Sequence, residues 1–363
     1  MRSMMKINKL IILITSFFVI LLGACNGGQD SSIPTVKDTQ PSVLYVMTHD
    51  SFAVSENLIV NFEKENNIEI KFVLSGDTGA ALNRAILTKE SPQADVFFGV
   101  DNTFLSRALD EGIFEPYNSP MLVNIDNSLR LDPENNALPV DFGDVCINYD
   151  KAYFAENKLS IPSSLSDLLL PEYYGLLVVE NPATSSPGLA FMLATIAEFG
   201  EDGYLDFWTN LKANGVMVVN DWESAYYSNF SASAGKGSQP MVVSYGSSPP
   251  AEVIFSETPL DDAPTASIIA TNTCFRQIEF VGILKGTQQR ELAEKFVDFL
   301  LDVPFQEDLP LQMFVFPANG KAQLPPEFEK FAQVPDQPAK LDPDLIAQNR
   351  EKWIQNWTLV VLR

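Results

Sequence analysis

The chain has 363 residues and carries 24 lysines and arginines against 47 aspartates and glutamates, a formal net charge of −23 at pH 7. So acidic a chain argues against nucleic acid or an anionic membrane surface as its partner, since both would repel it. It would suit a cationic ligand, although an acidic surface that only keeps an exported protein soluble explains the charge equally well.

The first 25 residues have the pattern of an export signal. Three basic residues precede an apolar run over residues 10–22, which is shorter than the roughly 20 residues that a membrane-spanning helix needs. The run ends in LGAC, which resembles the bacterial lipobox, whose cysteine receives lipid and becomes the new N-terminus. We therefore predict a signal peptide over residues 1–24 and a lipid anchor on Cys25, at the extracytoplasmic face of the cell membrane. Loss of the three basic residues would change the net charge from −23 to −26.

A polar segment follows the predicted anchor. Residues 25–42 are rich in Gly, Ser, Pro and Asp and show no apolar periodicity, so they are expected to form a flexible tether and no core. From residue 43 the composition is that of a folded protein, and the remaining length of about 320 residues favours two domains over one.

Strands and helices alternate in the first part of the folded region. Apolar runs predict strands over 43–47, 69–74 and 94–100, and periodic segments predict helices over 56–66 and 80–89. Polar or glycine-rich residues follow each strand. This is the pattern of a doubly wound α/β sheet, in which ligands bind at the carboxyl ends of the strands.

A second α/β set begins near residue 137. We predict strands over 141–149, 176–179, 217–219, 241–244 and 278–284, and helices over 188–199 and 290–301. The series suggests two lobes around a hinged cleft. Lobe 1 would comprise residues 43–140 and, after a return that ends in a C-terminal helix, residues 275–363; lobe 2 would comprise residues 141–274.

The cysteines exclude one kind of site and leave one question open. With Cys25 assigned to the anchor, Cys146 and Cys274 remain, and both lie in runs that read as strands. In an exported protein they could form a disulfide, or they could be two buried thiols. His49 is the single histidine and there is no CxxC pair, so no zinc site is expected, and no cofactor is predicted either.

The segment NPATSSPG over residues 181–188 leads directly into the apolar helix. Ser186 and Pro187 form a good N-cap and first-turn pair, and a helix start rich in hydroxyls and free amides can also bind a phosphate or carboxylate. Capping alone would explain these residues. The loop over 75–79 has the same ambiguity, since turn chemistry explains its glycine and aspartate equally well.

Aromatic residues follow several predicted strands. Trp222, Tyr245 and Phe314 could stack on a flat ring or on a cation, or they could be core residues. No GxSxG, Walker or HExxH motif is present, and one histidine cannot serve a convincing catalytic triad. We therefore predict a binding protein and no enzyme, with His49 in a loop or cleft.

Seven segments in order along residues 43–357 resemble the thiamine-binding proteins of bacterial ABC importers. They are THDSF at 48–52, the Asp77 loop with LNR at 82–84, ADV at 94–96 with DN at 101–102, TSSPGL at 184–189, DW at 221–222 with AY at 225–226, SY at 244–245 with SP at 248–249, and FP at 316–317. The resemblance implies a type II periplasmic-binding-protein fold that closes on thiamine or its mono- or diphosphate. It also implies a receptor, expected to be a monomer, that delivers the ligand to ABC permease subunits.

The resemblance also implies roles for individual residues. Asp77 and Thr78 would approach the ligand, Thr184 and Ser185 would lie at the helix start that receives phosphate, and Trp222 and Tyr245 would surround the rings. Phe314 stands where family members carry a stacking tryptophan, and His49 stands where a tyrosine is usual. His49, Asp50 and Tyr226 lie in the matching segments and complete the implied ligand set.

Two alternatives to a thiamine receptor remain. The same fold could hold ferric iron, a polyamine or a phosphonate, and Tyr226-Tyr227 could mimic the tyrosine pair of an iron receptor. Thiamine-degrading enzymes also resemble this fold and use a cysteine nucleophile. Cys146 and Cys274 have no candidate base nearby in the sequence, whereas a nucleophilic cysteine needs an activating partner and access.

Overall fold

The computed structural model describes residues 41–232 and 237–363. The predicted signal peptide, Cys25 and the tether up to residue 40 lie outside the described residues. Ser42 already pairs with Ile68 in the sheet, so regular structure begins one residue before the predicted boundary. Within the described ranges, no helix has both the length and the apolar character that a membrane crossing requires.

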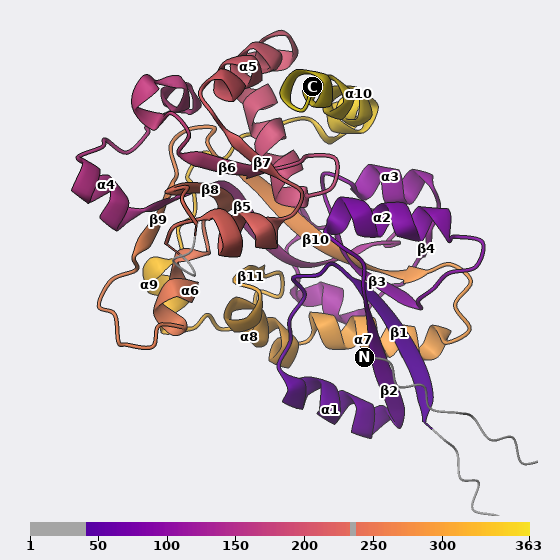
Figure 1. The fold of residues 1–363 in the computed structure, drawn as a ribbon. Helices are drawn as coiled ribbons and strands as arrows, with labels where there is room; N and C mark the ends of the chain where they lie inside the picture. Colours follow the sequence, from indigo (N-terminus) through magenta and orange to yellow (C-terminus); the bar gives the residue numbers. More distant parts are fainter. Residues whose placement is uncertain (1–40, 233–236) are drawn as a thin grey trace, which may run out of the picture. The chain divides into compact units, whose positions relative to one another are not determined.

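The described residues form one mixed sheet of eleven strands (Figure 1). Its main path is β2 (Ile68–Leu74), β1 (Ser42–Thr48), β3 (Val96–Asp101), β10 (Phe275–Leu284), β5 (Leu138–Asp150), β8 (Met241–Tyr245), β6 (Leu177–Glu180) and β7 (Met217–Val219). Three short strands join it at the side, namely β4 (Phe114–Glu115), β9 (Thr265–Ile268) and β11 (Phe316–Pro317). The predicted α/β class is confirmed. The two long strands β10 and β5 run antiparallel through the middle and connect two parallel groups of strands.

Helices cover both faces of the first parallel group. Helices α2 (Thr78–Leu87) and α3 (Leu105–Asp110) lie on one face of β1 and β3, and α1 (Glu56–Asn66) and α7 (Arg290–Leu301) lie on the other (Figure 1). Phe62 of α1 contacts Phe296 and Phe299 of α7, and all six residues of β3 are buried between the two layers. The predicted bounds of α1 and α7 are confirmed, because their apolar residues recur with the period of a helix. The other helices are α4 (Lys151–Asn157), α6 (Pro249–Ile254), α8 (Val303–Gln312) and α9 (Pro326–Phe331).

Helix α5 (Ser186–Ala213) consists of two helical segments that meet at Gly200, whose backbone is not helical, so the first segment ends where the predicted helix over 188–199 ends and the second was not predicted. It starts with Ser185 at the N-cap, one residue before the predicted cap, and it continues past a kink at Gly200, whose φ is 74°. The polar, glycine-containing stretch after Phe199 hides the continuation from a local pattern. Tertiary packing stabilises the second half of the helix, since Trp208 there is fully buried and lies edge-on against Trp357, with 5.3 Å between the ring centres.

The C-terminal helix α10 (Pro343–Val361) lies beside α5 (Figure 1). The Tyr204 hydroxyl of α5 donates to the Trp353 carbonyl at 3.3 Å, while Arg350 of α10 donates to the Thr103 carbonyl at 3.0 Å. Residues 275–363 were predicted to belong to lobe 1, but α10 touches segments assigned to both lobes. The division into lobes at residues 140 and 275 stays a prediction.

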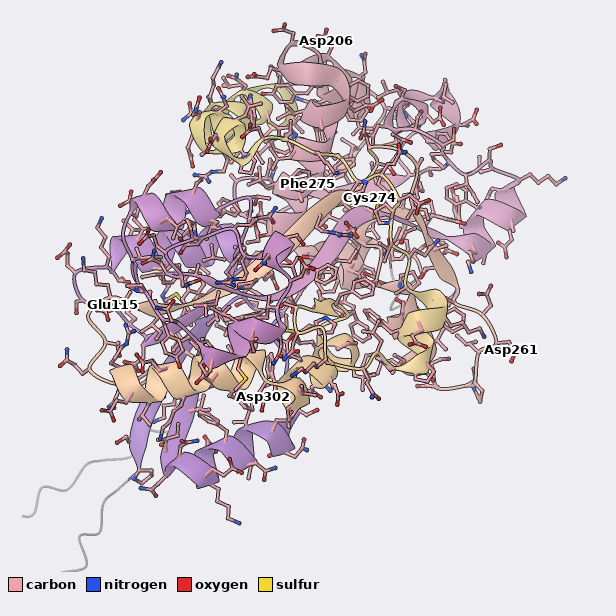
Figure 2. The ribbon with its side chains drawn as sticks, turned by 180° about the vertical axis from the view of Figure 1, so that it is seen from behind. Glu115, Asp206, Asp261, Cys274, Phe275 and Asp302 are labelled. Carbon is pink, nitrogen blue, oxygen red and sulfur yellow. A yellow bond between two sulfur atoms is a disulfide. The ribbon has the colours of Figure 1, made fainter. Side chains whose placement is uncertain are left out.

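Cys146 and Cys274 are joined in a disulfide. Cys146 lies in β5, and Cys274 lies directly before β10, where it is labelled beside Phe275 in Figure 2. The antiparallel pairing of Phe275 with Val145 makes the two cysteines the next cross-strand neighbours, with Cα atoms 4.3 Å apart. The sequence left open whether these cysteines form a disulfide or remain two buried thiols, and the structure contains the disulfide.

Candidate ligand-binding cavity

A cavity of about 260 Å³ lies where several strands end. Its lining comes from the segments that follow β1, β2, β6, β7 and β8, together with residues of β10 and the chain after α8. All five of those strands belong to the two parallel groups. The cavity therefore lies at carboxyl ends of parallel strands, as the alternation of strands and helices led us to expect.

The loops after β1 and β2 are tied together at one side of the cavity. The Asp50 carboxylate accepts from the Gly76 amide at 2.8 Å, and Asp77 caps α2 by accepting from the Thr78 amide at 3.1 Å. His49, Asp50, Asp77 and Thr78 all line the cavity. His49 lies against Gly99. Glycine is favoured at this position for two reasons: its φ is +105°, which other residues rarely adopt, and a Cβ there would be 2.5 Å from the His49 ring.

Two stacked aromatic rings form another wall. Trp222 follows β7 and stacks on Tyr226, with ring centres 5.1 Å apart and an interplanar angle of 19°. The Trp222 indole N–H donates to the Ser244 hydroxyl at 3.0 Å, and the Tyr226 hydroxyl donates to Glu252 at 2.8 Å. These hydrogen bonds fix both rings before any ligand arrives, so the wall is pre-organised.

Tyr245 and Phe314 complete the aromatic lining. Tyr245 packs over Gly143, where a Cβ would approach its ring to 2.7 Å. Phe314 has a φ of 57°, an unusual value for an aromatic residue that costs about 1–3 kcal/mol. Its ring meets Phe255 edge-on at 5.5 Å. The backbone of Phe314 therefore has a strained conformation, and in this conformation its ring lines the cavity.

The cavity is strongly acidic. Asp50, Asp77, Glu223 and Glu279 line it, and among the described residues of the lining His49 is the one basic side chain. His49 Nε2 lies 3.6 Å from Glu279 Oε1. Burial alone would lower the pKa of His49, but Glu279, with smaller effects from Asp77 and Asp50, raises it above its ordinary value. Burial raises the pKa of Asp77, against the opposite effect of the nearby Ser185 hydroxyl.

Glu279 belongs to a row of carboxylates that crosses the sheet. In the strand register it lies opposite Asp101 of β3 on one side and opposite Asp141 of β5 on the other. We call Asp101, Glu279 and Asp141 the acidic row. Burial raises the pKa of Asp101 to about 7, and burial together with Glu279 raises the pKa of Asp141 well above its usual range. No group of three or more His, Cys, Asp and Glu side chains within 41–232 and 237–363 could hold a metal ion.

The structure brings together most of the residues that the resemblance implied. His49, Asp50, Asp77, Thr78, Trp222, Tyr226, Tyr245 and Phe314 all line the cavity. Thr184 and Ser185 do not: Thr184 donates to the Asn220 carbonyl at 2.7 Å, and Ser185 is fully buried beside Asp77. Their neighbours Ser186 and Pro187 reach the lining instead, and the Ser186 hydroxyl donates to the Asp101 carboxylate.

The sequence analysis did not identify Glu279 or Glu223 as site residues. In a chain with 47 acidic residues, one more carboxylate carries no local signal. A usable signal did exist for Glu279, because it is the one charged residue in the otherwise apolar stretch 278–284 of β10. Acidic residues are rarely buried without a partner or a function, so such an interruption marks a candidate.

Comparison with known proteins agrees with this geometry. The model of a family described as bacterial extracellular solute-binding protein matches residues 91–338. The thiamine-binding periplasmic protein of Escherichia coli (strain K12) is 30% identical over 88% of this chain and 94% of its own length. A protein of the same name from Brucella suis biovar 1 (strain 1330) is 29% identical over 98% of this chain and its own full length. A solved periplasmic thiamin binding protein has a TM-score of 0.77 at 27% identity, covering 89% of this chain and 97% of that one.

Proposed function

Because the chain belongs to the family of bacterial extracellular solute-binding proteins, we propose that it is a receptor that binds thiamine or a thiamine phosphate and delivers it to an ABC permease. Its fold is the two-lobed type II fold of periplasmic binding proteins. Receptors of this architecture work by hinge closure around the ligand, and we expect the same motion here.

One observation carries the proposal, namely that carboxylates and aromatic rings line the same cavity. Four carboxylates supply negative charge, and Trp222, Tyr226, Tyr245 and Phe314 supply ring faces. A flat cationic heterocycle satisfies both, since each good cation–π contact contributes about 0.5–2 kcal/mol and the carboxylates balance the charge. Thiamine, with its thiazolium and aminopyrimidine rings, has this chemistry, and the names of the similar proteins point to the same ligand.

Titration with thiamine should change the intrinsic tryptophan fluorescence with saturation at micromolar concentration or below. Trp222 is the one tryptophan of four that lines the cavity, whereas Trp208, Trp353 and Trp357 are buried elsewhere. Replacing Trp222→Phe keeps a ring face, so this variant should bind with only a few-fold weaker affinity by calorimetry while most of the fluorescence change is lost.

The same titration is run with thiamine monophosphate and thiamine diphosphate. Absence of saturable binding by all three up to about 1 mM would contradict the proposed ligand. A matched Trp208→Phe variant should keep the fluorescence response, because Trp208 lies against Phe191 and Trp357 in the core.

A ferric-iron receptor is less well supported by the same cavity. The Tyr226 hydroxyl donates to Glu252, and burial, with Glu252 adding to it, raises the pKa of Tyr226 well above its usual range. Burial raises the pKa of Tyr227 and of Tyr245 as well. Iron coordination by tyrosine needs the phenolate form, which these surroundings disfavour.

A thiamine-degrading activity also fits poorly. The nucleophile of such an enzyme is a cysteine thiolate, and Cys146 and Cys274 are buried and joined to each other. Neither cysteine lines the cavity. We therefore propose binding without catalysis.

We further propose that lipid on Cys25 anchors the receptor, and that the tether after it keeps the folded body near the permease. A Cys25→Ala variant should leave the membrane fraction of the producing cells, because no acylated cysteine remains to hold it there. Fractionation and the mass of the N-terminal peptide measure the change. Retention of the variant in the membrane fraction to the extent of the unchanged protein would contradict the anchor.

A further inference from the structure

The floor of the cavity carries a charge arrangement that the proposed function does not by itself require. Glu279 is 7% exposed and lines the cavity, and its two register partners, Asp101 and Asp141, are fully buried behind the lining. Like charges directly opposite one another on neighbouring strands destabilise a sheet. Full ionisation of three neighbouring carboxylates is therefore costly, and a positive charge in the cavity would offset that cost.

The protein itself supplies little positive charge at this place. The titratable groups facing Glu279 are His49 after β1, Asp101 on β3, Asp141 on β5 and Tyr245 on β8. Arg276, on the same strand as Glu279, is already paired with Asp144 through two hydrogen bonds of 3.0 and 2.7 Å. Behind the row, the buried Arg350 of α10 donates to the Thr103 carbonyl and interacts electrostatically with Asp101, but it does not line the cavity. Among the described residues of the lining, His49 alone can offset the acidic charge.

We propose that Glu279 is the carboxylate that recognises the positive charge of the ligand, and that the acidic row with His49 releases a proton when that charge enters. The inference rests on the proposed function, because it concerns the same cavity. The step is a proton transfer: the ligand cation stabilises the ionised carboxylates, an O–H or N–H bond of the row or His49 breaks, and the proton passes to water or buffer.

The protonation of the row supports this coupling. With the pKa of Asp101 raised to about 7 and that of Asp141 raised well above its usual range, the empty cavity retains protons near neutral pH. A permanent cation in a poorly solvated site favours the ionised form of nearby carboxylates and lowers their pKa. Affinity for the cation should therefore rise as pH increases from 6 to 8.

The test compares the purified protein with its Glu279→Gln variant by calorimetry. The variant keeps the shape of the side chain and loses its charge, so thiamine should bind at least about 30-fold more weakly. Oxythiamine, which keeps the thiazolium and lacks the pyrimidine amino group, should lose the same factor. A Glu257→Gln control, at an exposed residue outside the lining, should bind both ligands unchanged.

Proton release gives a second, independent readout on the unchanged protein. Calorimetry at pH 7 in two buffers of different ionisation enthalpy should show net release on thiamine binding. Equal affinity of Glu279→Gln, a loss seen with thiamine but not with oxythiamine, or absence of proton release would each overturn the inference. Absence of thiamine binding by the unchanged protein would instead overturn the proposed function. If Glu279→Gln does not fold, the inference is tested by the thiamine affinity of Glu279→Asp and by proton release from the unchanged protein.

Discussion

Removal of the disulfide, by Cys146→Ala together with Cys274→Ala, is expected to lower the free energy of unfolding by about 2–5 kcal/mol. The bond closes a loop between residues 128 positions apart in the sequence, so its loss returns much conformational freedom to the unfolded chain. That loop contains β6, β7, β8 and β9 with helices α4, α5 and α6. The double substitution leaves no unpaired buried thiol to complicate the comparison.

Chemical denaturation of the oxidised protein, the reduced protein and the double variant measures this effect. The reduced protein and the variant should unfold at similar, lower denaturant concentrations. Because Cys146 is paired in register with Ser244, whose hydroxyl accepts from Trp222, thiamine titration of the variant shows whether the cavity wall is retained. Equal stability of all three forms would mean that the sheet pairing alone holds β5 against β10.

Asp101→Asn should remove the part of the pH-dependent loss of stability between pH 4 and pH 7 that comes from this side chain. The folded-state pKa of Asp101 is raised from 3.8 to about 7 by burial, so the folded protein holds the proton more tightly than the unfolded chain does. Its stabilising contribution is fully present below pH 4 and is lost as pH rises through 7. The loss is on the order of 4 kcal/mol, at about 1.4 kcal/mol for each pH unit.

The measurement is the difference in unfolding free energy between variant and unchanged protein at several pH values from 4 to 8. That difference should shift in favour of the variant as pH rises, and Asp206→Asn, at an exposed position on α5, is the control for loss of a surface carboxylate (Figure 2). The amide introduced by Asp101→Asn can still accept from the Thr103 amide and donate to Ser186, so the fold should persist. A constant difference for Asp101→Asn would show that burial does not hold the proton on this side chain.

The local elements of this fold could be predicted where one short-range signal dominates. The helix over Glu56–Asn66 and the strand Met217–Val219 follow from apolar periodicity and β-branched composition. The end predicted for the helix over 188–199 is confirmed, since Gly200 is not helical, whereas the second segment of α5, which packs through Trp208 on α10, was not predicted. The position of α10 in the fold could not be predicted, since a local sequence pattern does not show which element an amphipathic helix packs against.

In the candidate site, too, some residues could be predicted from the sequence and others were placed only by the tertiary structure. Asp77, Trp222 and Tyr245 were found through a family resemblance and the polar or aromatic character of strand ends, and the structure brings them to one cavity. For Thr184 and Ser185, local reasoning suggested a place for an anion. The structure puts Ser185 beside Asp77 and bonds Ser186 to Asp101, so carboxylates of the protein itself already lie at this helix start.

Contiguous residues and composition were enough to predict the α/β class, the acidic character and the kind of residues that end the strands, while the export signal stays a prediction. The pairing of Cys146 with Cys274 and the row of Asp101, Glu279 and Asp141 became visible only in three dimensions. The cysteines lie in β5 and directly before β10, and the three carboxylates lie in β3, β10 and β5. These segments are far apart in the sequence, and the antiparallel register of β10 between β3 and β5 places them side by side. Register depends on the burial of whole strands, which no short segment can specify.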